Sequence, residues 1–321
     1  MHYDIMLEQQ LSRDMVLSIG YVGTRGRNLL RFNTPNLGPA STIVPDSFTV
    51  FLDPLAIPVV QGRVRPPSRS VAGVGAINQF ETSASSNFNS IQVQLRGRFN
   101  RWFSYQTNYT YSHANDDVSD VFDLAGAPAL PQNSLTFAGE RGPANFDSRH
   151  RGAYAVMYEV PSAGPTASML RKLVNGIELS STGRMSSGQP FTVNSVFDVN
   201  LDGNLTDRLD NTNGLVETGD AQQPLILVGP TAQMLAPVGS DGRIGRNTFR
   251  AGGTVIFDVA ASKRFSFTSS QSFSFRVEVF NFLNRANFGV PVRYLEAPAF
   301  GSSTNTTTPG RRVQLSLKYL F

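Results

Sequence analysis

The sequence predicts an all-β fold: a segment of an antiparallel up-and-down transmembrane β-barrel with about nine strands. The first reason is that apolar and polar residues alternate along each of the predicted strands, as side chains alternate between the two faces of a strand. The second is their length of about ten residues, which lets a tilted strand cross a bilayer, whereas strands of soluble proteins usually have about five or six. The third is that short and long connections alternate along the chain. A membrane barrel likewise has short turns at its periplasmic end and long loops at its extracellular end.

Composition narrows the class of protein further. Charged residues make up 16% of the 321 residues, whereas an average soluble domain has about 25%. No run of 18 apolar residues is present, so the sequence offers no transmembrane helix. The chain has no cysteine, which excludes disulfides and thiolate metal sites. Its net charge of +4 comes from scattered Lys and Arg, which argues against nucleic acid as a partner.

The first four strands are predicted near residues 2–11, 15–22, 91–99 and 103–111. Short turns at 12–14 and 100–101 join them in pairs. A long loop is expected from residue 23 to 85, because its seven prolines cannot donate hydrogen bonds to a sheet. The sequence therefore predicts two hairpins separated by this loop.

The other five strands are predicted near residues 147–160, 174–188, 255–265, 273–279 and 311–321. Long loops are expected at 113–145, 189–253 and 281–310, and the loop at 189–253 is the longest polar stretch. Aromatic side chains stand near the strand ends, where membrane barrels carry interfacial girdles. They are Tyr3, Tyr21, Phe99, Phe103, Tyr111, Tyr158, Phe265, Phe273 and Tyr319.

The last strand has the cleanest alternation in the chain. One side is apolar and the other is polar, because side chains alternate with period two. The apolar side carries Val313, Leu315, Leu317, Tyr319 and Phe321, and the polar side carries Arg312, Gln314, Ser316 and Lys318. An edge strand of a soluble sandwich would alternate in the same way. Strand length, loop pattern and girdle together favour the membrane barrel, and we expect the apolar side to face lipid.

Three strings resemble those of TonB-dependent transporters with Oar-like barrels. They are residues 146–151 (FDSRHR), residues 187–191 (SGQPF) and, as the strongest match, residues 277–289 (VEVFNFLNRANFG). The resemblance covers nearly the whole chain, but only the C-terminal part of such a transporter. It implies a bacterial outer-membrane protein whose barrel has 22 strands, together with a plug domain and a carboxypeptidase-regulatory-like domain, neither of which is in this sequence.

The resemblance also implies partners and a function. The stripe from Val313 to Phe321 would be the signal read by the barrel-assembly machinery, and outer-membrane lipid would cover the barrel. TonB, acting through the missing N-terminal region, would energise the passage of an unidentified solute. The alternative is a surface barrel that serves adhesion or display through its long loops. TonB-box and plug sequences upstream would favour transport, and adhesive repeats would favour the alternative.

One loop has the spacing of a calcium-binding loop. The pattern D-x-N-x-D-G places oxygen ligands at alternate positions around a glycine that allows a sharp turn. The candidate ligands are Asp198, Asn200, Asp202, Asn204 and Asp207. The twelfth position, which normally supplies a bidentate carboxylate, is Leu209. Because Asn, Asp and Gly also make ordinary turns, a polar loop without metal is the competing interpretation.

No enzyme is predicted. The three histidines, His2, His113 and His150, belong to no zinc-protease motif, and the chain has no G-x-S-x-G elbow.

Besides the candidate calcium loop, the sequence has a second group of acidic residues, which we expect to form a solvated loop. It consists of Asp116, Asp117, Asp120 and Asp123.

The strand count leads to one more expectation, that this chain is an incomplete protein. A bacterial single-chain barrel has an even number of strands, and both of its ends lie in the periplasm. Nine strands counted back from Phe321 place Met1 at the extracellular rim and leave the first strand with an unpaired edge, which lipid does not satisfy. We therefore expect residues 1–321 expressed alone to aggregate.

Overall fold

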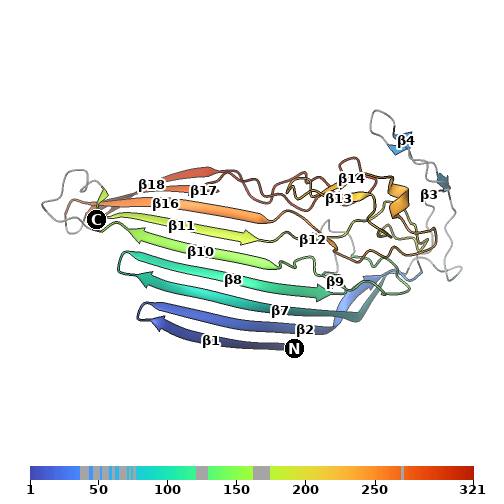
Figure 1. The fold of residues 1–321 in the computed structure, drawn as a ribbon, viewed down its shortest axis with the longest axis horizontal. Helices are drawn as coiled ribbons and strands as arrows, with labels where there is room; N and C mark the ends of the chain where they lie inside the picture. The colour runs from blue at the N-terminus through green and yellow to red at the C-terminus, as the bar shows by residue number, and fades with distance from the viewer. Residues whose placement is uncertain are drawn as a thin grey trace.

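Nine long strands lie side by side in one antiparallel sheet of the computed structural model (Figure 1). The structure describes residues 1–36, 71, 74, 77–120, 129–161, 174–268 and 271–321, and the backbone of four short strands between 43 and 64. In sheet order the nine strands are β1 (His2–Ser12), β2 (Met15–Asn33), β7 (Gln79–Phe99), β8 (Phe103–Asp116), β10 (His150–Glu159), β11 (Ile177–Ser186), β16 (Thr254–Ser266), β17 (Ser272–Phe280) and β18 (Arg312–Leu320).

The remaining elements are short and lie outside this row of strands. A two-residue strand, β9 (Gly142–Pro143), pairs with the end of β8. Four small pairings complete the list: β3 (Ile43–Pro45) with β6 (Gly62–Val64), β4 (Phe51–Leu52) with β5 (Pro58–Val59), β12 (Pro190–Phe191) with β15 (Phe249–Arg250), and β13 (Leu215–Glu217) with β14 (Leu225–Leu227). The 3-10 helix η1 (Thr231–Met234) follows β14.

The strand registers join the apolar stripes into one continuous face. Val313 of β18 lies opposite Val279 of β17, which lies opposite Val259 of β16. Such rows continue across all nine strands to β2 and β1, where Tyr21 lies opposite Ile5. We call this apolar side the outward face and the opposite, polar side the lumen face. The predicted sheet of nine alternating strands is confirmed.

β2 and β7 are longer than the sequence predicts. Residues 23–33 and 79–85, expected in a loop, continue these strands, and residues 29–33 pair with residues 79–84. Both segments are largely polar or glycine on the two faces, so they lack the alternation that marks a membrane strand. The register shifts on both sides of Leu29, next to Asn28 with its positive φ of 54°, which marks a β-bulge. β8 likewise continues to Asp116, into the loop expected at 113–145.

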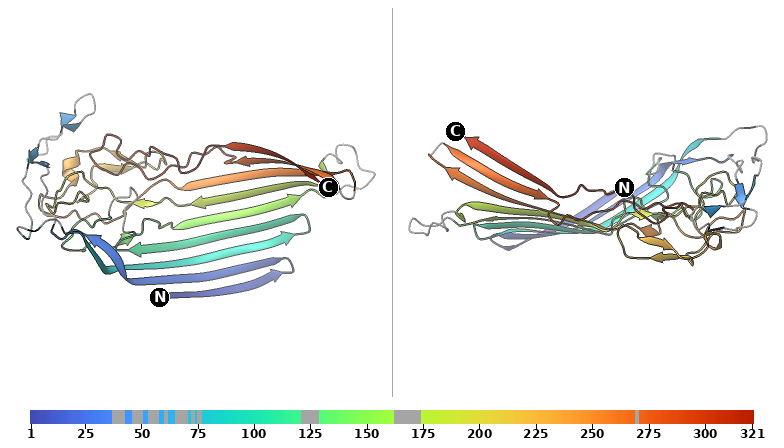
Figure 2. Two further views of the ribbon diagram at one scale, coloured as in Figure 1. Left: turned by 180° about the vertical axis from the view of Figure 1, so that it is seen from behind. Right: turned by 90° about the horizontal axis from the view of Figure 1, so that it is seen from above.

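The long loops gather at one end of the sheet and the short turns at the other (Figure 1). The C-terminus lies at the turn end, and seen from above, β16, β17 and β18 rise away from the other strands (Figure 2). β1 and β18 are the two edges of the sheet and, in the described part of the chain, do not pair with each other. No helix in the described residues has the length and apolar character needed to cross a membrane.

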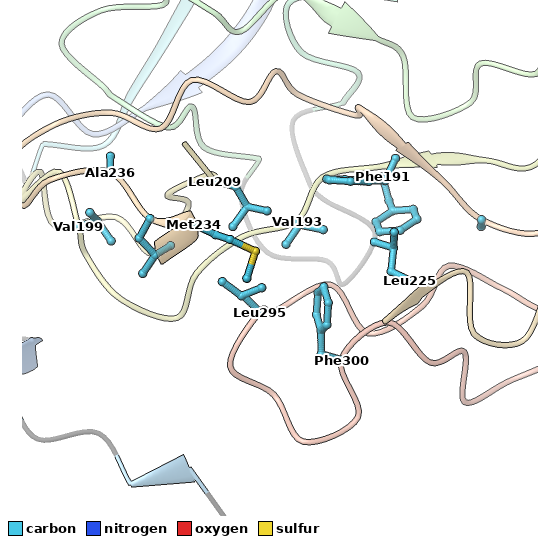
Figure 3. Close-up of a cluster of buried hydrophobic side chains, with 12 residues drawn as sticks. Phe191, Val193, Val199, Leu209, Leu225, Met234, Ala236, Leu295 and Phe300 are labelled. Carbon is cyan, nitrogen blue, oxygen red and sulfur yellow. The ribbon is translucent and has the colours of Figure 1, made fainter. Parts of the chain in front are cut away.

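The described loops at 129–149, 187–253 and 281–311 form what we call the loop cap. It contains the main buried hydrophobic cluster, although the sequence predicts a polar excursion at 189–253 (Figure 3). Phe191 comes from β12, Met234 from η1 and Leu295 from the loop before β18, and each is at most 2% exposed. The apolar residues of the cap come from short, widely separated segments such as residues 191–193 and 234–236, so their convergence depends on the tertiary fold.

Candidate functional site

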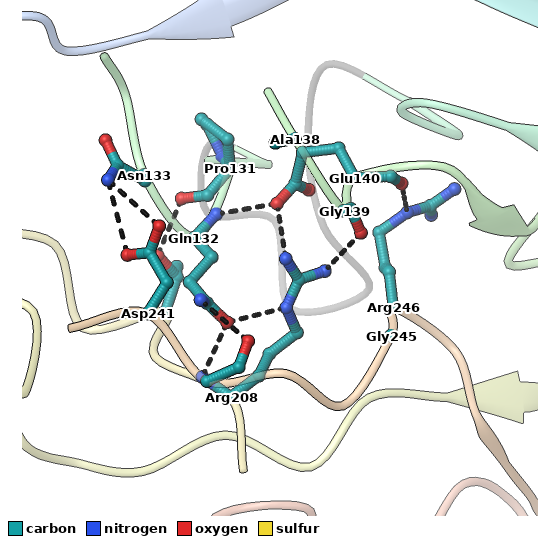
Figure 4. A network of polar contacts seen from close by, with 12 residues as sticks. Pro131, Gln132, Asn133, Ala138, Gly139, Glu140, Arg208, Asp241, Gly245 and Arg246 are labelled. Carbon is teal, nitrogen blue, oxygen red and sulfur yellow. Dashed lines mark hydrogen bonds and ion pairs between the residues drawn. The ribbon is translucent and has the colours of Figure 1, made fainter. Parts of the chain in front are cut away.

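A buried arginine connects two loops of the cap (Figure 4). Arg208 donates from Nη2 to Oε1 of Glu140 at 2.7 Å and from Nε to Oε1 of Gln132 at 2.7 Å. Arg208 and Glu140 are each 4% exposed. Since a buried charge is costly unless it is paired and hydrogen-bonded, this contact fixes the loop before β10 against the loop after β11.

The expectation of a solvated acidic loop after β8 is wrong for its first residue. Asp116 is 2% exposed and forms an ion pair with Arg246, whose Nε donates to the carbonyl oxygen of Glu140 at 2.9 Å. Asp117 is partly buried, which by itself would raise its pKa. Hydrogen bonds from Ser85 and the charge of Arg141 outweigh burial, and its pKa is lowered. Asp123 lies outside the described residues.

Asp147, in the first string that resembles the transporters, joins three elements. Its carboxylate accepts hydrogen bonds from the backbone N–H of Ala114 in β8 at 2.7 Å, from Arg250 in β15 at 2.5 Å and from Arg149 at 3.1 Å. Burial would raise the pKa of Asp147, but these donors lower it. The aspartate therefore anchors the cap to the top of the sheet as a carboxylate.

The candidate calcium loop is closed by its own hydrogen bonds. Asp207 accepts the backbone N–H groups of Val199 and Asn200 at 3.0 and 3.3 Å, and Asp198 accepts that of Gly203 at 3.0 Å. Asn204 and Asn200 also bind outside the loop. Asn204 donates to Ser134 at 3.1 Å, and Asn200 donates to the carbonyl of Gln132 at 2.8 Å. The loop is thereby tied to the loop before β10.

Three carboxylates of this loop influence one another. Burial, together with the charges of Asp202 and Asp198, raises the pKa of Asp207 to about 8. Burial, and to a smaller extent Asp198, raises the pKa of Asp202 to about 6. Leu209, at the twelfth position, is 0% exposed in the hydrophobic cluster. No group of three or more His, Asp or Glu side chains in the described residues is arranged to hold a metal. Calcium binding stays a prediction from the sequence.

A hollow of about 960 Å³ lies where the lumen face meets the loop cap. Arg151, Arg184 and Asp258 line it from the sheet, and Arg312 lines it from the start of β18. None of the three arginines forms an ion pair with a carboxylate in the described part of the chain. The volume is within the range of small-molecule sites, about 300–1,000 Å³. The hollow can therefore admit a solute of moderate size.

The predicted assembly signal lies on one face of the last strand. Leu315, Leu317 and Tyr319 lie opposite Val277, Phe275 and Phe273 of β17, all on the outward face. The rings of Tyr319 and Phe273 are 4.9 Å apart between centroids. Val313 belongs to the same stripe, and Phe321, just past the strand, is 93% exposed. Recognition of these residues by an assembly machinery stays a prediction.

Sequence reasoning missed the partners that hold the cap together. Arg208 and Glu140 are 68 residues apart, and Asp116 and Arg246 are 130 apart. No local spacing signals such pairs. The only hint is that the loops contain single charged residues among glycine, proline and apolar residues, where a charge must find a partner once it is buried.

Comparisons with known proteins agree with this geometry. A family model described as an outer membrane beta barrel domain matches residues 1–314. The chain is similar to the crystal structure of the outer membrane transporter YddB from Escherichia coli, with a TM-score of 0.51, 8% identity, and coverage of 100% of this chain and 32% of that one. It also matches the ferric-catecholate import receptor Fiu from E. coli K12, with a TM-score of 0.44, 10% identity, and coverage of 99% and 27%.

The two structures differ in sequence from this chain so much that the likeness to YddB concerns the fold alone, and this chain spans less than a third of the length of either. No curated protein matches the sequence. The family model, in contrast, covers nearly all of the chain. The chain therefore belongs to the family of outer membrane β-barrel domains, and its place is the bacterial outer membrane.

Proposed function

We propose that this chain forms part of the barrel wall of an Oar-like, TonB-dependent transporter that moves a solute across the outer membrane. Three strings that resemble such transporters support the proposal, the strongest at residues 277–289. The fold shared with an outer membrane transporter agrees with it. In this proposal TonB supplies the energy, and the barrel has 22 strands and encloses a plug, as the resemblance implies.

The observation that carries the proposal is the hollow between the lumen face and the loop cap. A wall that served only as an anchor would need no space of about 960 Å³ below its loops. Arg151, Arg184 and Arg312 border that space without a carboxylate partner in the described residues. Such groups can contact a solute on its way from the cap into the lumen.

Solute depletion in culture tests this proposal. Bacteria with and without the gene are grown in the same medium, and the solutes left behind are compared by mass spectrometry. We expect at least one solute to remain in the medium of the deletion strain and also in that of a strain without TonB. The variant Arg184→Glu should slow its uptake, whereas Arg98→Glu, on the same face near the turns, should not. Equal depletion by all strains would contradict transport.

The second candidate is adhesion or display through the loops. The observation in its favour is that the loop cap has a hydrophobic cluster and buried ion pairs of its own, which make a defined outer surface. A deletion strain that takes up every solute normally but binds surfaces or neighbouring cells less well would favour this function. Transport and adhesion thus give opposite results in the depletion experiment.

A further inference from the structure

A basic cluster lies on the outward face, near the loop end of β2 and β7. A hollow of about 640 Å³ is lined there by Arg25 and Arg27 of β2, by Arg141 of the loop before β10, and by Tyr3 and Asn89. Arg25 and Arg27 are exposed. Arginines are unexpected on a face that carries mainly apolar side chains, because a charge in contact with lipid tails is costly.

The position of this cluster along the strands explains how arginines can occur on the lipid-facing side of the sheet. Tyr21 and Tyr111 lie in one row with Ile91, and their rings belong to the predicted girdle at the membrane interface. The hydroxyl groups of Tyr3 and Tyr21 both donate to Oδ1 of Asn89, at 3.4 and 2.8 Å, one row further toward the loops. The arginines lie just beyond this row. They are therefore at the height of the lipid headgroups, on the side of the long loops, which is the extracellular side.

The charges of the cluster are only partly compensated. Arg141 forms an ion pair with Asp117 at 3.0 Å and also donates to Ser85 at 3.1 Å. Arg25 and Arg27 form no ion pair with any residue that the structure describes. Glu81, the next carboxylate along β7, accepts a hydrogen bond from Ser83 at 2.6 Å. Two guanidinium groups therefore remain for an external anion, and guanidinium binds phosphate in a bidentate geometry.

We propose that this cluster binds the phosphate-bearing headgroup of a lipid in the outer leaflet. The ligand is a lipid and not a free anion because the cluster lies on the outward face, directly above tyrosines that suit the interface, so that acyl chains can lie along the apolar rows below. The β-bulge near Asn28 follows Arg27 immediately and reshapes the strand at this point. Phosphate contact there would fix the height of β2 and β7 in the membrane.

Native mass spectrometry of the full-length, detergent-extracted protein tests the proposal. The probes are phosphorylated lipid A, the same lipid without its phosphates, and inorganic phosphate at equal phosphate concentration. We expect tighter binding of the phosphorylated lipid than of the dephosphorylated one. The double variant Arg25→Gln/Arg27→Gln should weaken it by about 30-fold, which corresponds to about 1 kcal/mol for each arginine near an anionic surface.

Two further variants serve as controls. Arg98→Gln/Arg264→Gln removes the same charge from the lumen face, outside the hollow below the cap, and should leave the affinity unchanged. Arg25→Lys/Arg27→Lys keeps the charge but loses the bidentate geometry, so it should retain only part of the affinity. Unchanged heat-modifiability in gels shows that each barrel is folded. Equal affinity for the two lipids, equal loss in the lumen-face control, or displacement of the lipid by inorganic phosphate would each overturn the proposal.

Discussion

The sheet and the loop cap are built for different surroundings. On the outward face of the sheet, large apolar side chains such as Leu317 and Leu179 are 69% and 44% exposed. Those of the cap, such as Leu209 and Met234, are fully buried. The sheet is held by backbone hydrogen bonds and relies on lipid to cover its apolar side, because every backbone polar group must be paired in the bilayer. The cap has a core like that of a soluble domain. One chain thus follows two sets of folding rules.

Breaking the Arg208–Glu140 pair should unfold the cap and spare the sheet. Arg208→Ala leaves the Glu140 carboxylate buried without its cation, which costs about 3–5 kcal/mol. The Arg243–Asp210 pair is the control, because the Arg243 side chain is 77% exposed and water screens its charge, so Arg243→Ala should affect the cap much less. Hydrogen exchange of cap and strand peptides in the detergent-extracted barrel measures both. Equal protection of the cap in the two variants would mean that the cap does not depend on its buried pair.

A charge on the outward face should act in the opposite way and destabilise the sheet. Leu317 and Ser316 are adjacent in β18 but belong to opposite faces, because Leu317 lies opposite Phe275 and Ser316 lies opposite Arg276. Arginine at Leu317 should cost about 2–4 kcal/mol near the bilayer midplane, and arginine at Ser316 much less. Heat-modifiability gels of outer membranes report the fraction of folded barrel. Equal losses of folded barrel would contradict the assignment of Leu317 to the outward face and Ser316 to the lumen face.

The pH should change the stability of the cap and leave that of the strands nearly constant. The pKa of Asp207 is raised to about 8, so the folded cap holds a proton that the unfolded chain releases near pH 4. This contribution is complete below about pH 4 and is lost as the pH rises toward 8. Asp117 and Asp147, with lowered pKa values, act in the opposite direction. Asp207→Asn should therefore reduce the loss of cap protection between pH 5 and 8, as measured by hydrogen exchange.

Calcium should have the smallest effect, and only on the cap. If the loop at 198–207 binds Ca²⁺ as an extracellular site, the dissociation constant should be about 0.1–1 mM, and Asp202→Ala should weaken it. Titration calorimetry of the barrel with calcium chloride, with magnesium chloride as the control, measures this. Absence of heat at millimolar calcium would assign the loop to structure alone, in agreement with the hydrogen bonds that already close it.

The sequence predicts the sheet well because the period-two pattern is local. Each of the nine strands can be identified from its own alternation. In the last strand, the apolar residues from Val313 to Tyr319 also indicate which side faces lipid. The ends of β2 and β7 were missed because polar residues on both faces leave no pattern, although their backbones pair. The cap was missed for another reason. Contacts such as Asp116–Arg246 join residues 130 positions apart, and no local period encodes them.

The extended ends of β2 and β7 also bear on how the molecule is encountered from outside. At about 3.3 Å per residue, the 21 residues of β7 reach some 70 Å, while about ten tilted residues cross the hydrocarbon. Of the remainder, residues 79–85 pair with β2 alone and form a two-stranded ribbon beyond the end of β8, on the side of the long loops. Antibodies, phages and proteases approaching the cell would touch this ribbon and the loops beside it before they reach any part of the wall. Because backbone pairing helps to maintain the ribbon, its exposed side chains, such as Leu30 and Phe80, can change to escape such agents while the wall below stays as it is.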